Sequence, residues 1–323
     1  MPRTAFLFLM LASGAAVAQQ PAPEQTLPQN PPAQPSATPA VPTPTEEQLA
    51  AQRKVEWFIK FPTELGLASS LDGSGNVTVS RVGADFEVDI PIATRGELDL
   101  GFSYDYTRYD FNDATGFVAG STSPFQDIHR EAFRVYYGQQ QTLQLGWSVG
   151  GSIGLSGEEG ADTADSVVGS VFAGVGYYLS RDLRVGVAVG IFSQLEQSPL
   201  ILPIPTFKWD ISPEWRLATA GKPGLTLFYS PNELWTFSAG AWYDLKNFRL
   251  SESGPIPGGV GRDEGVPVQL GVSYKPTANV SMDLTGGVRL MSNYEVLNSS
   301  GNKIADVESD PMPYLGITIG LKF

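Results

Sequence analysis

Charged side chains recur at every second position in several segments of this chain, a spacing that brings them to one face of a β-strand. The acidic members come first and the basic members follow. The set comprises Asp85, Glu87, Asp89, Asp99, Asp105, Arg130, Arg134 and Arg184. If they point into the lumen of a barrel, an acidic wall would face a basic wall, and such crossed charges orient dipolar solutes and select ions. The alternative is that the charges pair with one another in a filled barrel that does not conduct.

Residues for other kinds of chemistry are few. The chain has no cysteine, which excludes disulfides, thiolate ligands and a cysteine nucleophile. Its one histidine, His129, shares the parity of Phe133, so we expect it near the outer rim and pointing away from the lumen. No G-x-S-x-G nucleophile motif is present, and the acidic segments around Glu158 and Asp306 lack the spacing of a calcium-binding loop. We therefore expect no enzyme, no bound metal and no cofactor.

The overall charge also restricts the partners. Thirty-four acidic residues against 21 basic ones give a net charge of −13. Nucleic acid is not an expected partner, because its binding requires lysine and arginine side chains that neutralise phosphates.

The first 18 residues have the pattern of an export signal. Arg3 supplies a positive start, residues 5–12 are apolar but too few to span a bilayer as a helix, and residues 16–18 are small, as at a cleavage site. Residues 19–50 are rich in proline, alanine and glutamine, so we expect a disordered tether in the periplasm. An exported chain without a long apolar run either is soluble or crosses a membrane as strands.

From residue 55 onward, apolar and polar residues alternate with a period of two. The clearest runs are residues 97–106, 143–155, 167–177, 183–191, 266–274 and 280–290. They exceed the ~5–6 residues of an ordinary strand and reach the ~9–11 that a tilted membrane strand needs. Run length therefore favours strands that cross a bilayer.

Short turns alternate with longer polar loops along the same region. We expect short turns at residues 93–96, 140–142, 180–182, 212–213, 230–233 and 276–278, and long loops at 70–76, 112–127, 156–165, 193–201, 219–224, 251–263 and 293–311. An up-and-down membrane barrel has this pattern, with tight turns on its periplasmic side. The count over residues 55–323 is about 14 strands, or 12 if Pro205, Pro213 and Pro223 break the middle pair.

Aromatic residues gather close to the short turns. They are Tyr136, Tyr137, Tyr177, Tyr178, Trp209, Tyr229, Trp235 and Tyr274. Such a girdle is expected where one rim of a barrel meets the lipid headgroups. A soluble exported β-sandwich or a lipocalin-like barrel would show the same alternation. Strand length, loop asymmetry and the aromatic rim together favour the membrane form.

The last ten residues carry a family resemblance. Leu315, Ile317, Ile319, Leu321 and Phe323 share one strand face. The segment resembles the C-terminal strand of bacterial outer-membrane barrels, which ends in an aromatic residue and is read by the barrel assembly machinery. The resemblance implies that Phe323, Leu321 and Ile319 form an assembly signal, and that this machinery is a partner during biogenesis.

A second resemblance covers the middle of the chain. Residues 203–215, from Pro203 to Trp215, and residues 227–234 with Gly240 look like segments of uncharacterised porin-like outer-membrane proteins, grouped only as domains of unknown function. The resemblance implies the same fold and location, and it supplies no substrate and no functional residue.

These patterns predict an all-β, antiparallel, up-and-down transmembrane β-barrel surrounded by the lipids of a bacterial outer membrane. We expect a passive channel for small hydrophilic solutes. The alternative is a closed barrel that acts as an envelope scaffold or a surface adhesin through its long loops. A transporter of hydrophobic solutes would require an apolar patch inside, and the inward positions offer little beyond Phe58 and Phe192.

Overall fold

The computed structural model describes residues 54–92, 95–219 and 223–323, and the structural statements below concern these residues. The expected export signal (residues 1–18) and the expected tether (residues 19–50) lie outside them. The described chain forms one sheet of 17 strands and one short 3-10 helix, η1 (Ala164–Ser166). No helix in these ranges is long and apolar enough to cross a membrane.

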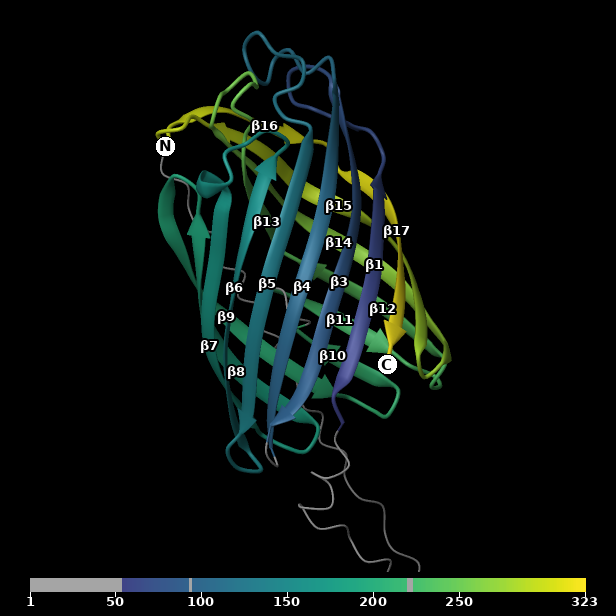
Figure 1. Ribbon diagram of the computed structural model, residues 1–323. Coiled ribbons are helices and arrows are strands. Elements are labelled where there is room, and N and C mark those ends of the chain that lie inside the picture. The colour runs from purple at the N-terminus through teal and green to yellow at the C-terminus, as the bar shows by residue number, and fades with distance from the viewer. Residues whose placement is uncertain (1–53, 93–94, 220–222) are drawn as a thin grey trace, which may run out of the picture. The chain divides into compact units, whose positions relative to one another are not determined.

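Fourteen strands, each antiparallel to its neighbours, form the wall of a closed barrel (Figure 1). In chain order they are β1 (Glu56–Gly66), β3 (Asn76–Ile92), β4 (Gly96–Asn112), β5 (Asp127–Gln140), β6 (Leu145–Glu158), β7 (Val167–Tyr178), β8 (Leu183–Gln194), β9 (Gln197–Asp210), β10 (Trp215–Ala218), β11 (Gly224–Tyr229), β12 (Trp235–Trp242), β14 (Val260–Thr277), β15 (Val280–Leu297) and β17 (Met312–Lys322). The barrel closes where β17 pairs with β1, and Phe323 exchanges two backbone hydrogen bonds with Trp57.

Three further strands lie at one end of the barrel, which we call the outer end because the long loops lie there. β2 (Ser69–Ser70) pairs with β3, and β16 (Lys303–Ser309) pairs with β15. β13 (Asp244–Arg249) continues the pairing of β12 along β14 and also meets β6 through a parallel bridge between Arg249 and Gly157. Since five wall strands separate β6 from β12, β13 crosses the interior between them.

The prediction of 14 strands rather than 12 is confirmed, although β10 and β11 are short. The three prolines of this region do not interrupt the pairing of β10 with β11. Pro213 lies in the turn closed by the hydrogen bond from Ile211 N to Trp215 O, and Pro223 precedes β11. Pro205 lies in β9 beyond the part that pairs with β10.

The outward face of the wall is apolar. Ile153, Leu270 and Leu315 are 61%, 69% and 62% exposed, and many other large apolar side chains on the same face are also exposed. A soluble protein rarely shows an apolar surface of this extent. The barrel is therefore of the transmembrane kind found in bacterial outer membranes, and a soluble sandwich or lipocalin-like barrel is excluded.

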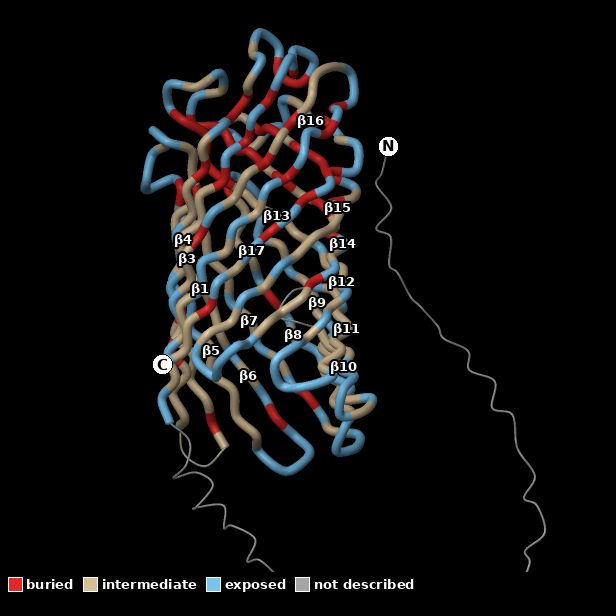
Figure 2. Tube along the Cα trace, turned by 90° about the vertical axis from the view of Figure 1, so that its right-hand side faces the viewer, coloured by how far each residue is buried: buried red, intermediate tan, exposed pale blue. Residues whose placement is uncertain are grey.

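The short-turn end, which we call the inner end, carries the aromatic rim. Trp215 stacks on Tyr229 and Trp235 on Tyr274, each pair with ring centroids 4.5 Å apart. Buried residues, by contrast, gather at the opposite, outer end around β16 (Figure 2). The two ends of the barrel therefore differ in packing as well as in loop length.

Candidate functional site

The inward positions of β3, β4 and β5 hold most of the charges singled out in the sequence. The strand register places Asp105 opposite Arg130 and Gly101 opposite Arg134, and an Arg134 nitrogen lies 3.7 Å from an Asp85 oxygen. These strands are consecutive, so the acidic and basic groups lie side by side on one wall. The expectation that they face each other across the lumen is wrong for these residues, because the alternation of a strand fixes its face but not the distance around the ring.

The wall opposite the acidic strands carries other basic groups. In a ring of 14 strands, β10 lies seven places from β3 in either direction. Its Arg216 lines one cavity at the inner end, which Lys275 of β14 also lines, whereas Lys60 and Lys322 line that cavity from β1 and β17, beside the acidic strands. Crossed charges are therefore present, with Arg216 rather than Arg130 or Arg134 on the far side.

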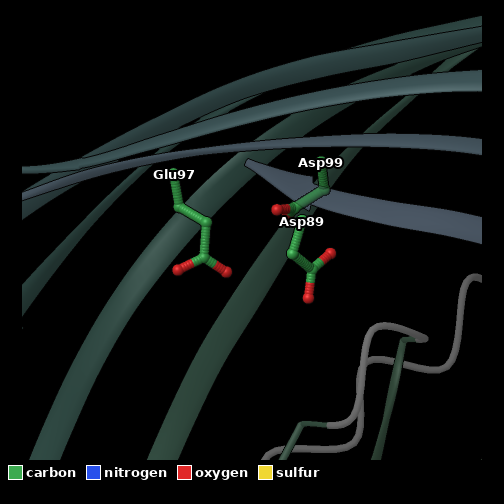
Figure 3. A group of neighbouring side chains, drawn as sticks. All are labelled: Asp89, Glu97 and Asp99. Carbon is green, nitrogen blue, oxygen red and sulfur yellow. The ribbon is translucent and has the colours of Figure 1, made fainter. Parts of the chain in front are cut away.

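Three carboxylates cluster toward the inner end of the acidic wall (Figure 3). Oxygens of Asp89, Glu97 and Asp99 all lie within 4.8 Å of one another, and Glu87 is two residues along β3 on the same face. Carboxylates of this kind, partly open to solvent, are common without an ion. The expectation of no metal stays a prediction, and the cluster is best described as a local concentration of negative charge.

Arg184 lies apart from the other candidates. It is on β8 opposite Lys208, and its guanidinium lies 5.5 Å from the ring centre of Tyr178, close to the turn that joins β7 and β8. This position is at the inner rim. Arg184 can therefore act at the mouth but does not lie with Arg130 and Arg134.

A buried ion network lies in the lumen between its middle part and the outer end. Asp263 is fully buried and lies 3.0 Å from Arg81 and 2.7 Å from Arg289. Arg81 also contacts Glu64 at 2.6 Å, and the Tyr109 hydroxyl donates to Asp263 at 2.7 Å. These residues come from β1, β3, β4, β14 and β15, so the network ties together strands from two sides of the ring.

Asp244 and Lys246 on the crossing strand β13 complete this network. Asp244 lies 3.7 Å from Arg289 and 3.9 Å from Lys246. With three acidic and three basic groups, the network has no net formal charge. Burial in such a place is tolerated because every charge has an opposite neighbour.

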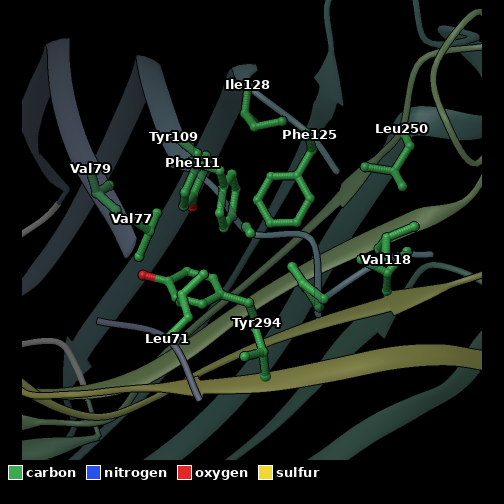
Figure 4. Close-up of a cluster of buried hydrophobic side chains, with 14 of the residues drawn as sticks. Leu71, Val77, Val79, Tyr109, Phe111, Val118, Phe125, Ile128, Leu250 and Tyr294 are labelled. Carbon is green, nitrogen blue, oxygen red and sulfur yellow. The ribbon is translucent and has the colours of Figure 1, made fainter. Parts of the chain in front are cut away.

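Above the network, the outer end is filled by an apolar core (Figure 4). Strands and inward-folded loops both contribute to it. The core comprises Leu71, Val77, Val79, Tyr109, Phe111, Ala114, Phe117, Val118, Phe125, Ile128, Phe248, Leu250, Tyr294, Val296, Val307 and Met312. We call this cluster the outer plug. Phe125 lies edge-on to Tyr109 and Phe248, with ring centroids 5.1 and 5.0 Å away.

The plug depends on a close approach of β13 to β14. A Cβ atom at Gly261 would collide with the ring of Phe248. Only glycine at position 261 therefore lets Phe248 lie flat against its neighbouring strand and reach the aromatic cluster.

Below the network, two cavities follow each other down the lumen. The middle cavity, about 600 Å³, is lined by charged side chains that include Asp85, Asp105, Arg130 and Arg134. The inner cavity, about 680 Å³, lies by the inner mouth. Both are lined by Gln269, Thr285 and Thr318, so they adjoin. The lumen below the ion network therefore holds two adjoining cavities, both lined in part by polar and charged side chains.

A third cavity of about 340 Å³ lies beside the middle one, between β13 and the inward faces of β6 to β9. It shares Arg130, Ala132, Ser152 and Asp244 with the middle cavity. Its remaining lining includes an apolar group, Val168, Phe192, Leu200, Leu202 and Leu245. The interior therefore holds more apolar surface than Phe58 and Phe192, the two residues expected from the sequence.

The sequence analysis missed several residues of the closure. Asp263 fell within a segment expected to be a loop, residues 251–263, whereas β14 begins at Val260. Glu64 and Arg81 lie on the inward faces of β1 and β3 but were not singled out. The sequence signal that could have identified them is the alternation of inward and outward residues, which in β14 continues beyond the lipid-facing part of the strand.

His129 is hydrogen-bonded rather than free. Its Nδ1 lies 2.9 Å from the Tyr104 hydroxyl, and its ring lies 5.2 Å from that of Tyr106. Both tyrosines have outward parity on β4, so His129 lies on the outer face of the wall, as expected. This position leaves it far from the charged lumen.

Comparison with known proteins gives only distant likeness. No family model and no curated protein matches the chain. Among solved structures, the toluene transporter TodX of P. putida is 12% identical, with 86% of this chain and 92% of that chain covered and a TM-score of 0.41. The KdgM porin is 9% identical, covers 81% of this chain and 97% of that chain, and has a TM-score of 0.34.

Proposed function

We propose that this protein is a porin-like channel for small hydrophilic solutes in the outer membrane, and that its outer plug must move before solutes pass. The observation that carries the proposal is the polar lumen, in which cavities of about 600 and 680 Å³ adjoin below the ion network. A barrel that served only as a scaffold would not require a polar lumen lined with charged side chains.

The charged side chains of the lumen support selection among solutes as well as their passage. The acidic side of β3 and β4 and Arg216 on the opposite strand β10 place charges of opposite sign on two sides of the inner half. In a confined lumen, such a field orients dipolar solutes and favours one sign of ion.

The outer plug makes this a gated channel in our proposal. Residues of the β4–β5 loop, among them Ala114, Phe117 and Phe125, are buried in the plug, so solute entering from outside meets packed side chains. Loops are held by fewer contacts than wall strands and are the elements that move most readily.

The test is single-channel conductance in a planar lipid bilayer. The full-length protein is compared with a variant in which residues 114–125 are replaced by a short Gly-Ser linker. We expect rare or no openings from the full-length protein and more frequent openings from the shortened one, in which the ion network still narrows the lumen. Circular dichroism and heat-modifiable gel mobility establish that both are folded.

A closed barrel is the second candidate, because the plug and the ion network together block the outer end in this conformation. In that case the cavities of the inner half would result only from the width of the barrel. The exposed loops would then be the surface that carries the function. Silence from the folded, inserted, loop-shortened variant would favour this candidate over the channel.

A further inference from the structure

The wall has a break on one side of its outer half. β10 pairs with β9 only from Lys208 to Asp210, and β10 itself has four residues. Thr219 adds one more hydrogen bond, from its backbone N to Phe207 O. Among the described residues, none pairs with this edge of β9 between residues 197 and 203, although the opposite edge pairs with β8 as far as Gln197.

Two prolines fit this unpaired edge. Phe207 O accepts from Thr219, and Asp210 N donates to Asp182 O on the β8 side, so odd-numbered backbone groups of β9 point to the break. Pro203 and Pro205 are odd-numbered, whereas Pro199 lies at the register shift between β8 and β9, where this alternation is interrupted. Proline has no N–H, and in sheets it is found where no partner strand needs one. The sequence of β9 is therefore suited to leave this edge open rather than to pair it.

The cavity of about 340 Å³ lies directly behind the break. Leu200 and Leu202 of β9 line it from one side of the break, and Pro223 and Tyr243 line it from the other. On the outward face of β9, between these two leucines, Ile201 is exposed with the rest of the apolar band. The cavity and the lipid-facing surface thus meet at the edge of one strand.

The cavity lining is divided by polarity. Val168, Phe192, Leu200, Leu202 and Leu245 supply an apolar part. Arg130 supplies a positive charge that has no ion-pair partner among the described residues, although Asp105 is its register neighbour. Asn247 also lines the cavity, and its side-chain oxygen is buried and has no hydrogen-bond partner in the part of the chain that the structure describes.

We propose that this cavity is a binding site for a small amphipathic anion, with its apolar body between β7, β8, β9 and β13 and its anionic group on Arg130, reached from the membrane through the break beside β9. An aromatic or short aliphatic carboxylate fits both the volume and the positive charge of Arg130, because Asp244, the acidic residue in the lining, is paired with Arg289 and Lys246. Binding at this site does not depend on conduction, so it can be tested separately from the proposed channel function.

The test uses 2-naphthoate as the probe and the full-length protein in lipid nanodiscs, with binding followed by calorimetry. We expect saturable binding by the unsubstituted protein. Arg130→Gln should weaken it by ~10-fold or more, since a hydrogen bond to a charged group is lost. Arg134→Gln is the matched control, because Arg134 lies on the same strand and face but lines only the middle cavity.

A second pair of variants tests the position of the binding site without changing any charge. Leu202→Trp fills the cavity and should abolish binding, whereas Ile201→Trp on the opposite face of β9 should leave it unchanged. Lipids with brominated acyl chains should quench the bound probe if the cavity opens to the membrane.

Several outcomes overturn the proposal. They are absence of saturable binding, equal effects of Arg130→Gln and Arg134→Gln, and binding that survives Leu202→Trp. Bound probe that brominated lipid leaves unquenched overturns the opening toward lipid. Binding without any conductance from the loop-shortened variant would overturn the channel function and leave this site standing.

Discussion

Asp263 shows how one residue organises the outer half of the barrel. It is fully buried, and three side chains from β3, β4 and β15 converge on its two oxygens. Removing one partner from a buried ion network is costly, because the charges left behind lose part of their compensation where water is scarce; without Asp263, Arg81 would keep only Glu64 and Arg289 only Asp244. The carboxylate at position 263 thus stabilises the closure through the two arginines that it holds.

We expect Asp263→Ala to lower the free energy of unfolding by about 3–5 kcal/mol, the usual cost of breaking a buried ion pair. Urea unfolding in detergent micelles, followed by tryptophan fluorescence, measures it. The control is Asp210→Ala, which breaks a pair with Lys208 in which both side chains are nearly half exposed and which should cost less than about 1 kcal/mol. Equal losses for the two variants would contradict the role given to Asp263.

Arg130 and Arg134 also act at the scale of single residues. In the loop-shortened variant, replacing both with alanine should shift ion selectivity toward cations, because Asp85 and Asp105 then dominate that part of the lumen. The reversal potential in asymmetric potassium chloride measures the shift. Lys303→Ala, at the outer end on β16, serves as the control and should change nothing. An unchanged reversal potential in the double variant would remove these arginines from the selectivity mechanism.

At the scale of elements, strand faces and turn positions followed from the sequence, whereas contacts between distant segments did not. The alternation in β4 or β6 and the turns after Gln140 and Tyr178 depend on neighbouring residues only. The inward fold of the β4–β5 loop depends on Phe125 meeting Phe248, more than a hundred residues away. The crossing of β13 and the neighbouring placement of Arg134 and Asp85 are likewise matters of ring geometry, which local patterns do not contain.

The unpaired edge of β9 gives a prediction about this element. Replacing Pro199, Pro203 and Pro205 with threonine would add three N–H donors to β9, and those of residues 203 and 205 would point to the break. Unpaired donors are costly in lipid and are also a template for pairing with another strand. We therefore expect the triple variant to form more dimer than the unsubstituted protein, as measured by chemical crosslinking in nanodiscs.

Pro231→Thr, in the short turn between β11 and β12, is the control for this experiment and should leave the crosslinking pattern unchanged. If the triple variant crosslinks no more than the control, the prolines are not what keeps this edge unpaired.

For the whole molecule, the decisive event is closure of the ring, which joins the first wall strand to the last. β1 and β17 pair from Phe58 with Lys322 to Gly66 with Tyr314, and Phe323 adds two backbone hydrogen bonds to Trp57. Until β17 is in place, the unclosed sheet has two open edges, one on β1 and one on its last formed strand. A last strand that assembly machinery recognises early would shorten the time for which those edges are exposed.

We therefore propose that the Phe323 side chain serves assembly more than stability. It is 65% exposed at the inner rim, so Phe323→Ala should leave urea stability in detergent nearly unchanged while it reduces, severalfold, the fraction of protein recovered folded in the outer membrane of an expressing cell. Heat-modifiable gel mobility of membrane fractions measures that fraction. Leu315→Ala, on the same face of β17 but away from its end, should assemble normally. Equal recovery of both variants would mean that Phe323 carries no signal and that ring closure depends on pairing alone.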